Sequence, residues 1–387
     1  MTVERVVAGG DGLARLADGR VVFVPGALPG ERVDAEIVGA KRDFARGRVE
    51  RITSPHEQRV VPPCPAWHRG CGGCDWQHAT SALQLEMKAE IVREALRRTG
   101  RIASPEVVAA GSVAPWAYRT SMRFALDDRG RPSLRRARSN DVVALDDCLV
   151  AHPSLAELLP ALRLPGAEEV SIRVSAATGE RTVWWTPSAR SVVGLPADVR
   201  VGEEAFLTEQ VAGAWMRVSV GSFFQSGPEA AELLVATVRA ACTDALDGAR
   251  HVVDAYGGVG LFATTVLAAA GAPITLVEGS PDACRDAGEN LAGLDASIVC
   301  SAVEAWQPTQ ADLVIADPSR QGLGTAAVER LAATEAGSIV LVSCDPVALA
   351  RDVTLLRAHG YHPGPTQVLD LFPQTHHVEA VTRFARS

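Results

Sequence analysis

The sequence predicts an α/β protein in three parts: a small β-barrel, a strand-rich central domain and a doubly wound parallel sheet. Residues 3–53 alternate short Val- and Ile-rich runs with Gly-Asp, Asp-Gly and Pro-Gly turns, a spacing typical of a five-stranded, OB-like barrel. Beyond residue 206, strand-like runs that end in small or acidic residues alternate with helical stretches. We therefore place the domains at 1–54, 55–205 and 206–387, and we allow for the helix expected at 81–99 to pack on the third domain.

The composition is that of a folded, soluble chain. Of its 387 residues, 47% are hydrophobic and 22% charged, which excludes disorder. There is no run of about 18 apolar residues and no basic-then-apolar leader, so we expect a cytoplasmic protein with no membrane contact. In that compartment the eight cysteines are better interpreted as thiols, metal ligands or nucleophiles than as disulfides.

The charge is unevenly distributed. Residues 1–150 carry 23 Arg and Lys against 19 Asp and Glu, whereas residues 151–387 carry 15 against 27. A mildly basic front half on an acidic body is compatible with a protein that touches nucleic acid with one face, and equally with an ordinary solvated surface.

The elements follow in order along the chain. After the barrel, a Pro-rich stretch at 54–65 indicates a linker, and residues 81–99 show helical spacing with Ser81 as a possible cap. From about 115 to 205 the pattern is again strand-rich, with hairpins around the turn at 128–132. The densest basic cluster lies here: Arg131, Arg135, Arg136 and Arg138. The later β-rich runs are HVVDAYGG, PITLVEGS, ADLVIADP and GSIVLVSC, with helical stretches at 261–270 and 346–358.

A glycine turn, AYGGVGLFA at 255–263, follows the first of these runs. Such a turn between a strand and a helix lets backbone amides approach a nucleotide-type ligand, and Glu278, at the end of the next strand, could accept bonds from a ribose diol. Gly258, Gly260 and Ala263 also fit the dinucleotide pattern G-x-G-x-x-A, so the turn alone permits NAD as readily as S-adenosylmethionine.

Three reactive side chains stand at or near the ends of later strands. Asp317 follows the fourth strand, and Cys344 follows the fifth, directly before a helix that begins with Pro. The positive end of that helix should lower the thiol pKa of Cys344 and favour the nucleophilic thiolate. Glu379 lies among apolar residues in a closing hairpin at 370–384, where we expect a proton acceptor with a raised pKa.

Four further cysteines form a second constellation. Cys64, Cys71 and Cys74 lie within eleven residues around two glycines, and Cys148 follows later. Four thiolates suit an iron–sulfur cluster or zinc, and the spacing does not separate the two. It differs from the C-x3-C-x2-C pattern of radical enzymes that cleave S-adenosylmethionine.

The motifs FFQ (223–225), YGGVG, DPSRQG, SCDP and FPQTHHVE, in this order, resemble the RNA 5-methyluridine methyltransferases of the TrmA/RumA family. The N-terminal barrel resembles the TRAM domain that many of these enzymes carry, so the resemblance covers nearly the whole chain. It implies that Cys344 is the nucleophile and Glu379 the base. It also implies a 4Fe-4S cluster on the four cysteines and S-adenosylmethionine bound by Gln225, Tyr256, Glu278 and Asp317.

The sequence departs from the family at a few positions: Ser319 replaces a second Pro, Asp345 an Asn, Gly257 a Cys and Gly227 an Asn. No thiol or base is removed, but Asp345 adds negative charge beside Cys344, which would raise the pKa of that thiol. The implied function is methyl transfer to carbon 5 of a uridine in structured RNA, 23S rRNA being favoured over tRNA, by a protein expected to be monomeric.

Two other functions stay open at this point. RNA 5-methylcytosine enzymes use the same addition chemistry but typically place a cysteine in the Asp-Pro motif, where this chain has Ser319. A non-catalytic RNA-binding iron–sulfur protein would keep the barrel and the metal site without turnover.

Overall fold

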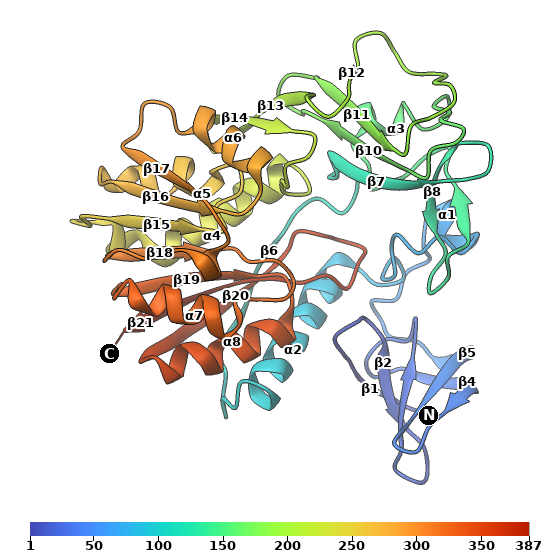
Figure 1. Ribbon diagram of the computed structural model, residues 1–387. Helices are drawn as coiled ribbons and strands as arrows, with labels where there is room; N and C mark the ends of the chain where they lie inside the picture. The colour runs from blue at the N-terminus through green and yellow to red at the C-terminus, as the bar shows by residue number, and fades with distance from the viewer. Residues whose placement is uncertain (387) are drawn as a thin grey trace.

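The computed structural model describes residues 1–386 and confirms the predicted α/β fold class (Figure 1). The small barrel lies at the N-terminal end, the strand-rich central domain follows it, and the large sheet with its helices forms the remaining body. None of the helices in residues 1–386 has both the length and the apolar character needed to cross a membrane.

The N-terminal barrel is a closed five-stranded sheet. Its strands are β1 (Val3–Val6), β2 (Gly12–Arg15), β3 (Val21–Val24), β4 (Arg32–Ala40) and β5 (Phe44–Ser54), in the order β1-β2-β3-β5-β4. A bridge between Thr2 and Arg32 joins the two edges of this sheet. Because the barrel is small, its core is made mostly of Val and Ala side chains, among them Val22, Val24 and Ala45.

The central domain contains a six-stranded sheet in the order β12-β11-β10-β7-β8-β9. Its strands are β7 (Ser121–Leu126), β8 (Pro132–Arg135), β9 (Val142–Ala144), β10 (Glu169–Val174), β11 (Arg181–Thr186) and β12 (Arg200–Val201), accompanied by the short helices α1 (Pro65–His68) and α3 (Pro153–Ala156). A separate hairpin, β13 (Phe206–Val211) and β14 (Ala214–Ser219), connects this domain to the large sheet.

The large sheet has eight strands in the order β17-β16-β15-β18-β19-β21-β20-β6. They are β6 (Val107–Ser112), β15 (Val252–Ala255), β16 (Ile274–Glu278), β17 (Ala296–Cys300), β18 (Leu313–Ala316), β19 (Ser338–Ser343), β20 (Tyr361–Asp370) and β21 (Glu379–Arg386). Only β21 runs antiparallel to its neighbours, β19 and β20.

Helices cover both faces of the large sheet. They are α2 (Ser81–Arg98), α4 (Pro228–Leu246), α5 (Leu261–Thr265), α6 (Pro281–Asn290), α7 (Gly324–Ala333) and α8 (Pro346–Ala358), with 3₁₀ turns at Leu267–Ala270 and Val303–Ala305. Successive strand residues point to opposite faces. Val252 thus belongs to the core shared with α4 and α5, and Val253 to the core shared with α2, α7 and α8.

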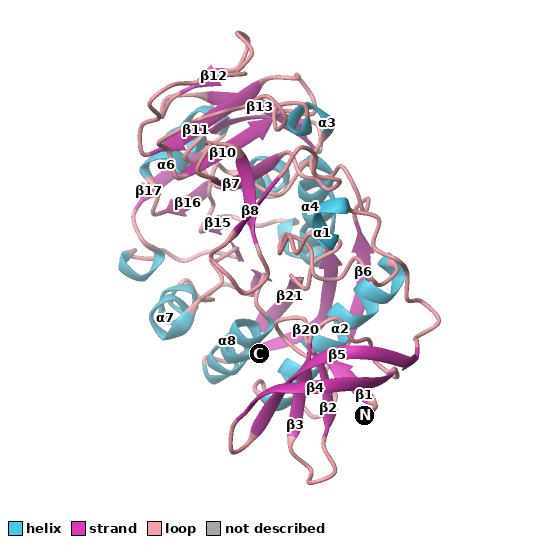
Figure 2. Cartoon of the chain, turned by 90° about the vertical axis from the view of Figure 1, so that its right-hand side faces the viewer, coloured by secondary structure: helices cyan, strands magenta, loops and turns pink. Residues whose placement is uncertain are grey.

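The packing of the helix at 81–99 on the third domain agrees with the sequence analysis, whereas the position of the strand at 107–112 differs from the division made there. Both α2 and β6 lie within the predicted central segment, 55–205, yet β6 pairs in parallel with β20 at the edge of the large sheet, and α2 packs on α8 and β20. Figure 2 shows α2 between the barrel and this sheet edge. The predicted cap is also shifted: Thr80, not Ser81, caps α2, its hydroxyl accepting a hydrogen bond from the Leu83 amide.

Candidate active site

A cavity of about 510 Å³ lies at the carboxyl ends of the parallel strands of the large sheet. This is the edge at which doubly wound sheets bind ligands, because the loops that follow parallel strands meet there. All six catalytic and cofactor-binding side chains assigned from the sequence line this cavity: Gln225, Tyr256, Glu278, Asp317, Cys344 and Glu379. Residues spread over 155 positions of the chain are thus brought to one place.

The glycine turn between β15 and α5 forms one wall of the cavity. Tyr256, Gly258 and Gly260 all have positive φ, at 58°, 55° and 90°. A Cβ on Gly257 would lie 2.6 Å from the Leu276 side chain, so only glycine fits there without displacing Leu276. The turn is held to α5 by the buried Asp254, a residue that the sequence analysis missed, whose carboxylate accepts a hydrogen bond from the Ala263 amide at 2.8 Å.

Glu278 is fixed at the end of β16 by two backbone amides. One carboxylate oxygen accepts from Gly258 N at 2.9 Å, and the other accepts from Ser280 N at 2.7 Å. Each oxygen has a further lone pair. The carboxylate therefore joins the glycine turn to the next loop and can still accept bonds from a diol in the cavity.

The opposite side of the cavity is acidic and buried. Burial raises the pKa of Asp317 to about 7. Burial also raises the pKa of Glu379 well above its usual value, and the nearby Asp317 raises it further, while Arg320 opposes the shift. The expected raised pKa of Glu379 thus agrees with the structure.

The expectation of a lowered pKa for Cys344 is wrong. Burial raises the pKa of this thiol to about 12, and the carboxyl groups of Glu379 and Asp317 add to the effect. The helix end does not serve the thiol, because the Asp345 side chain occupies it: its carboxylate accepts hydrogen bonds from Val347 N and Ala348 N at 2.9 and 2.8 Å. Cys344 is therefore a protonated thiol in the ligand-free cavity.

The loop between β20 and β21 supplies the remaining wall, with Phe372 and His377 lining the cavity just before Glu379. Burial lowers the pKa of His377 to about 4, so its ring is neutral near pH 7. His376 lies beside it and contacts Asp75 through both its amide and its ring. Arg320 is a further lining residue that the sequence analysis did not single out, although it stands in the quoted DPSRQG motif.

The four clustered cysteines line a second, smaller cavity of about 90 Å³ in the central domain. Burial raises the pKa of Cys74 to about 12 and that of Cys148 to about 11, and neighbouring thiols contribute to both shifts. Cys64 and Cys71 lie on the same cavity. The side chains assigned to metal binding are thus brought together.

The donor set of this second cavity suits a soft cation. Neighbouring thiols raise the pKa of Cys71, Cys74 and Cys148, and a positively charged group among them would favour the thiolate forms. Within residues 1–386, however, no group of three or more Cys, His, Asp or Glu side chains is arranged to hold a metal ion. The donor set by itself suits an iron–sulfur cluster or zinc.

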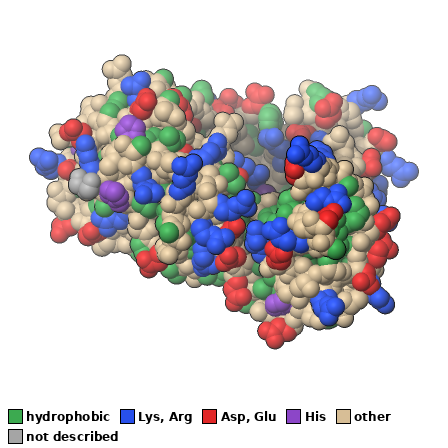
Figure 3. Space-filling view, turned by 90° about the horizontal axis from the view of Figure 1, so that it is seen from below, with side chains coloured by type: hydrophobic (Ala, Val, Ile, Leu, Met, Phe, Trp, Pro, Cys, Tyr) green, Lys and Arg blue, Asp and Glu red, His purple; other side chains and the backbone are tan. Residues whose placement is uncertain are grey.

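Arginines of the densest basic cluster and of the barrel are partly paired within the protein. Arg138 forms an ion pair with Asp11 of the barrel, and Arg131 with Asp127. On the barrel, Arg42 is almost fully exposed, whereas Arg48 pairs with Glu36. Figure 3 shows Lys and Arg side chains gathered along the middle of one face, between the body at the left and the barrel at the right.

Comparison with known proteins agrees with this architecture. The TRAM domain family matches residues 1–49. The chain is 34% identical to an uncharacterized RNA methyltransferase of Streptomyces avermitilis, over 97% of this chain and 95% of the relative. It is 32% identical to the 23S rRNA (uracil(1939)-C(5))-methyltransferase RlmD of Shewanella amazonensis, over 99% and 95%.

A solved structure shows the same fold. The tRNA (uracil-54, C5)-methyltransferase of Pyrococcus abyssi, in complex with S-adenosyl-L-homocysteine, superimposes with a TM-score of 0.74 over 100% of both chains at 23% identity. The fold and the cavity at the strand ends thus define a class I, S-adenosylmethionine-dependent methyltransferase preceded by a TRAM domain. The relatives make the assignment narrower: the chain belongs to the TrmA/RumA-type RNA methyltransferase family.

Proposed function

We propose that this enzyme transfers a methyl group from S-adenosylmethionine to carbon 5 of a uridine in structured RNA. The observation that carries the proposal is the shared cavity, which holds a thiol, Cys344, and a buried carboxyl group, Glu379, beside the glycine turn. Methyl transfer to an oxygen or nitrogen atom needs no protein thiol. Carbon 5 of uracil is a poor nucleophile and does need one.

In the proposed reaction, Cys344 loses its proton to solvent and its sulfur bonds to carbon 6 of the uracil. The electron pair of the 5,6 double bond moves into an enolate, which makes carbon 5 nucleophilic. S-adenosylmethionine supplies an electrophilic methyl group on a sulfonium sulfur, and carbon 5 takes that group. The Glu379 carboxylate then removes the carbon 5 proton, the double bond re-forms, and the thiolate leaves carbon 6. A stacked target base must be flipped out to reach Cys344.

The other lining residues bind and orient the reactants. Glu278, fixed by Gly258 N and Ser280 N, is placed to accept bonds from the ribose diol of the cofactor. We assign Gln225, Tyr256 and Asp317 to the same cofactor site because they line the cavity around it. Holding both substrates in attack geometry contributes roughly 7–11 kcal/mol to lowering the barrier in well-oriented systems.

We favour 23S rRNA as the substrate, because the Shewanella relative carries that activity in its name and matches over nearly the whole chain. The Pyrococcus structural neighbour acts on tRNA, which makes tRNA the alternative. We propose that the TRAM barrel and the cluster around Arg131 and Arg138 contact the RNA backbone. Their charge would make the affinity for RNA salt-dependent.

For the four-cysteine cavity we propose a 4Fe-4S cluster rather than zinc. The support is the donor set, four thiols around one cavity, together with the family resemblance, which implies a 4Fe-4S cluster on these residues. The residues that would hold it are Cys64, Cys71, Cys74 and Cys148. Because the proposed methyl transfer involves no net oxidation or reduction, we give the cluster a structural role.

A covalent trap tests the catalytic proposal. We expect RNA that contains 5-fluorouridine to form a stable adduct with the protein in the presence of S-adenosylmethionine, because fluorine at carbon 5 cannot leave as a proton. Mass spectrometry should place the adduct on Cys344, and Cys344→Ala should form none. The matched control is Cys300→Ala, an exposed cysteine that does not line the cavity.

Two outcomes of these experiments would contradict the proposed methylation of uridine. No adduct with folded, cofactor-binding protein would favour an RNA-binding protein without turnover, which the high pKa of Cys344 makes a real alternative. Methylation of cytidine instead of uridine would favour the 5-methylcytosine reaction, which the Ser319 position argues against.

A further inference from the structure

The loop at 371–378 helps to form the catalytic cavity. It connects β20 to β21, places Phe372 and His377 in the wall of the catalytic cavity, and ends directly at Glu379. It has no helical or strand hydrogen bonding of its own. A shift of this loop would therefore displace the cavity wall and the proposed base together.

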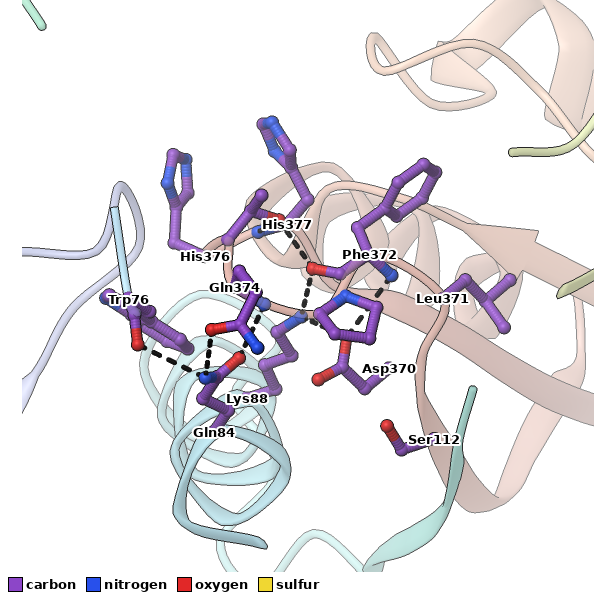
Figure 4. A network of polar contacts seen from close by, with 12 residues as sticks. Trp76, Gln84, Lys88, Ser112, Asp370, Leu371, Phe372, Gln374, His376 and His377 are labelled. Atoms are coloured by element: carbon purple, nitrogen blue, oxygen red, sulfur yellow. Dashed lines mark hydrogen bonds and ion pairs between the residues drawn. The ribbon is translucent and has the colours of Figure 1, made fainter. Parts of the chain in front are cut away.

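Two side chains of α2 hold the loop from below, as Figure 4 shows. The Lys88 ammonium contacts Asp370 Oδ1 at 2.5 Å and donates to the Phe372 carbonyl oxygen at 3.1 Å. The Gln84 carboxamide accepts from Gln374 N at 2.7 Å and donates to the Gln374 side-chain oxygen at 3.1 Å. Lys88 and Asp370 lie 282 positions apart in the sequence.

The Lys88–Asp370 pair is completely buried, both side chains being 0% exposed. Burial lowers the pKa of Lys88, and the Asp370 carboxylate opposes that shift. Within residues 1–386, Asp370 Oδ2 has no hydrogen-bond partner. A buried ion pair with an unsatisfied oxygen contributes little to the stability of the fold, because the cost of desolvating the two charges offsets much of their attraction. Stability alone therefore does not account for the presence of this pair.

The residue at position 88 is a lysine in a chain whose basic residues are nearly all arginines. The chain contains 36 arginines and only two lysines, Lys41 and Lys88, so arginine is its usual basic residue. Lys88 lies where a compact ammonium must reach both a carboxylate and a backbone carbonyl in a closed space. A planar guanidinium is larger and presents its donors in a fixed fork.

We infer that Lys88 is a positioning residue for catalysis: by bonding Asp370 and the Phe372 carbonyl, it fixes the 371–378 loop so that the cavity wall and Glu379 are held in working geometry. Gln84 supports the same loop one turn earlier on α2. The inference rests on the proposed function for its catalytic consequence, whereas its structural content, the ordering of the loop, does not depend on it.

The test must distinguish an effect of Lys88 on the position of the loop from an effect on the stability of the whole protein. It compares the variant Lys88→Met with the double variant Lys88→Met/Asp370→Asn. The single variant leaves an unpaired buried carboxyl and should be strongly destabilised. The double variant removes both charges while Asn keeps an oxygen for the Phe372 amide, so folding should largely recover. Cofactor affinity, measured by calorimetry, should stay within about twofold of the parent, because Glu278 and the glycine turn lie on other strands.

In the double variant we expect two changes to persist after folding recovers. Amides of 371–378 should exchange with deuterium faster than in the parent. The single-turnover rate of adduct formation should fall roughly 10- to 100-fold, the usual effect of a misplacement of about 1 Å in an active site. The matched control is Arg97→Met, an exposed position on the same helix paired only with Glu94.

A double variant with parental loop exchange and a parental adduct rate would overturn the inference and leave Lys88 with a structural role only. If the parent protein itself forms no adduct, the proposed function fails, and the exchange of the loop amides still decides whether Lys88 orders the loop.

Discussion

The acidic wall of the catalytic cavity predicts that the methyl donor and its product respond differently to pH. S-adenosylmethionine carries a fixed positive charge on sulfur, whereas S-adenosylhomocysteine has a neutral thioether and is otherwise nearly the same molecule. Asp317 lines the cavity and has a pKa of about 7 because it is buried. The ratio of the two dissociation constants therefore isolates the interaction between the sulfonium and the cavity carboxyl groups.

The magnitude follows from the ionised fraction of Asp317. With a pKa of about 7 the carboxyl group is roughly one tenth ionised at pH 6 and roughly nine tenths at pH 8. If the sulfonium lies about 5 Å from the Asp317 carboxylate, the two unit charges attract each other by roughly 3 kcal/mol at an effective dielectric constant of about 20. This attraction is enough to lower the pKa of Asp317 in the complex by about two units. Since a raised pKa leaves the free group neutral below pH 7, cofactor affinity should increase about tenfold relative to product affinity between pH 6 and pH 8.

Isothermal titration calorimetry of both ligands at pH 6, 7 and 8 measures this ratio directly. Repeating the titration in buffers of different ionisation enthalpy should show close to one proton released per cofactor bound at pH 6 and little at pH 8. Asp317→Asn should flatten the ratio, and Glu379→Gln measures how much of the pH dependence the second carboxyl group of the cavity contributes. If the ratio of the two dissociation constants does not depend on pH in the parent, the electrostatic reasoning is refuted. If its dependence on pH is unchanged in Asp317→Asn, the group that titrates is a residue other than Asp317.

Four further predictions concern single features of the structure. Glu379→Gln should form the covalent adduct with ordinary uridine RNA but stall before release, which denaturing gel electrophoresis detects as accumulated protein–RNA complex. The rate of adduct formation should increase about tenfold per pH unit between pH 7 and 9, because a thiol with a pKa of about 12 is almost fully protonated there; a flat stopped-flow profile would show that the free thiolate is not the attacking species. Gly257→Ala should lower the free energy of unfolding by about 1–3 kcal/mol in urea titrations, because its Cβ meets Leu276. Cys74→Ser should abolish iron and sulfide binding, measured by chemical analysis, and leave the cofactor affinity of the folded fraction unchanged if the cluster is structural.

The assembly of the catalytic cavity could be predicted from the sequence because the information is local to each strand. Asp317 and Cys344 follow strand-like runs directly, and parallel strands deliver their carboxyl ends to one edge. Once each strand was located, the shared position of these side chains followed from topology. The same local reasoning placed Glu278 at the end of the strand next to the glycine turn.

The features that could not be predicted depend on contacts between distant segments. The pKa of Cys344 is set by burial against Glu379 and Asp317, which outweighs the helix end that the sequence made visible. The strand at 107–112 has no mark that assigns it to one sheet rather than another. Likewise, nothing near Lys88 indicates a partner 282 positions away.

The raised pKa values of the proposed catalytic groups have a common consequence for the reactivity of the thiol. Cys344, Asp317 and Glu379 share one buried cavity, and each of the two carboxyl groups makes ionisation of the thiol harder. Arg320 is the one arginine or lysine among the described residues that line this cavity, so the free site favours protonated, unreactive forms. We expect the positive sulfonium of the cofactor to offset this mutual repulsion, whereas its neutral product does not. The Cys344 thiol should therefore ionise more readily with the methyl donor bound than with the product bound.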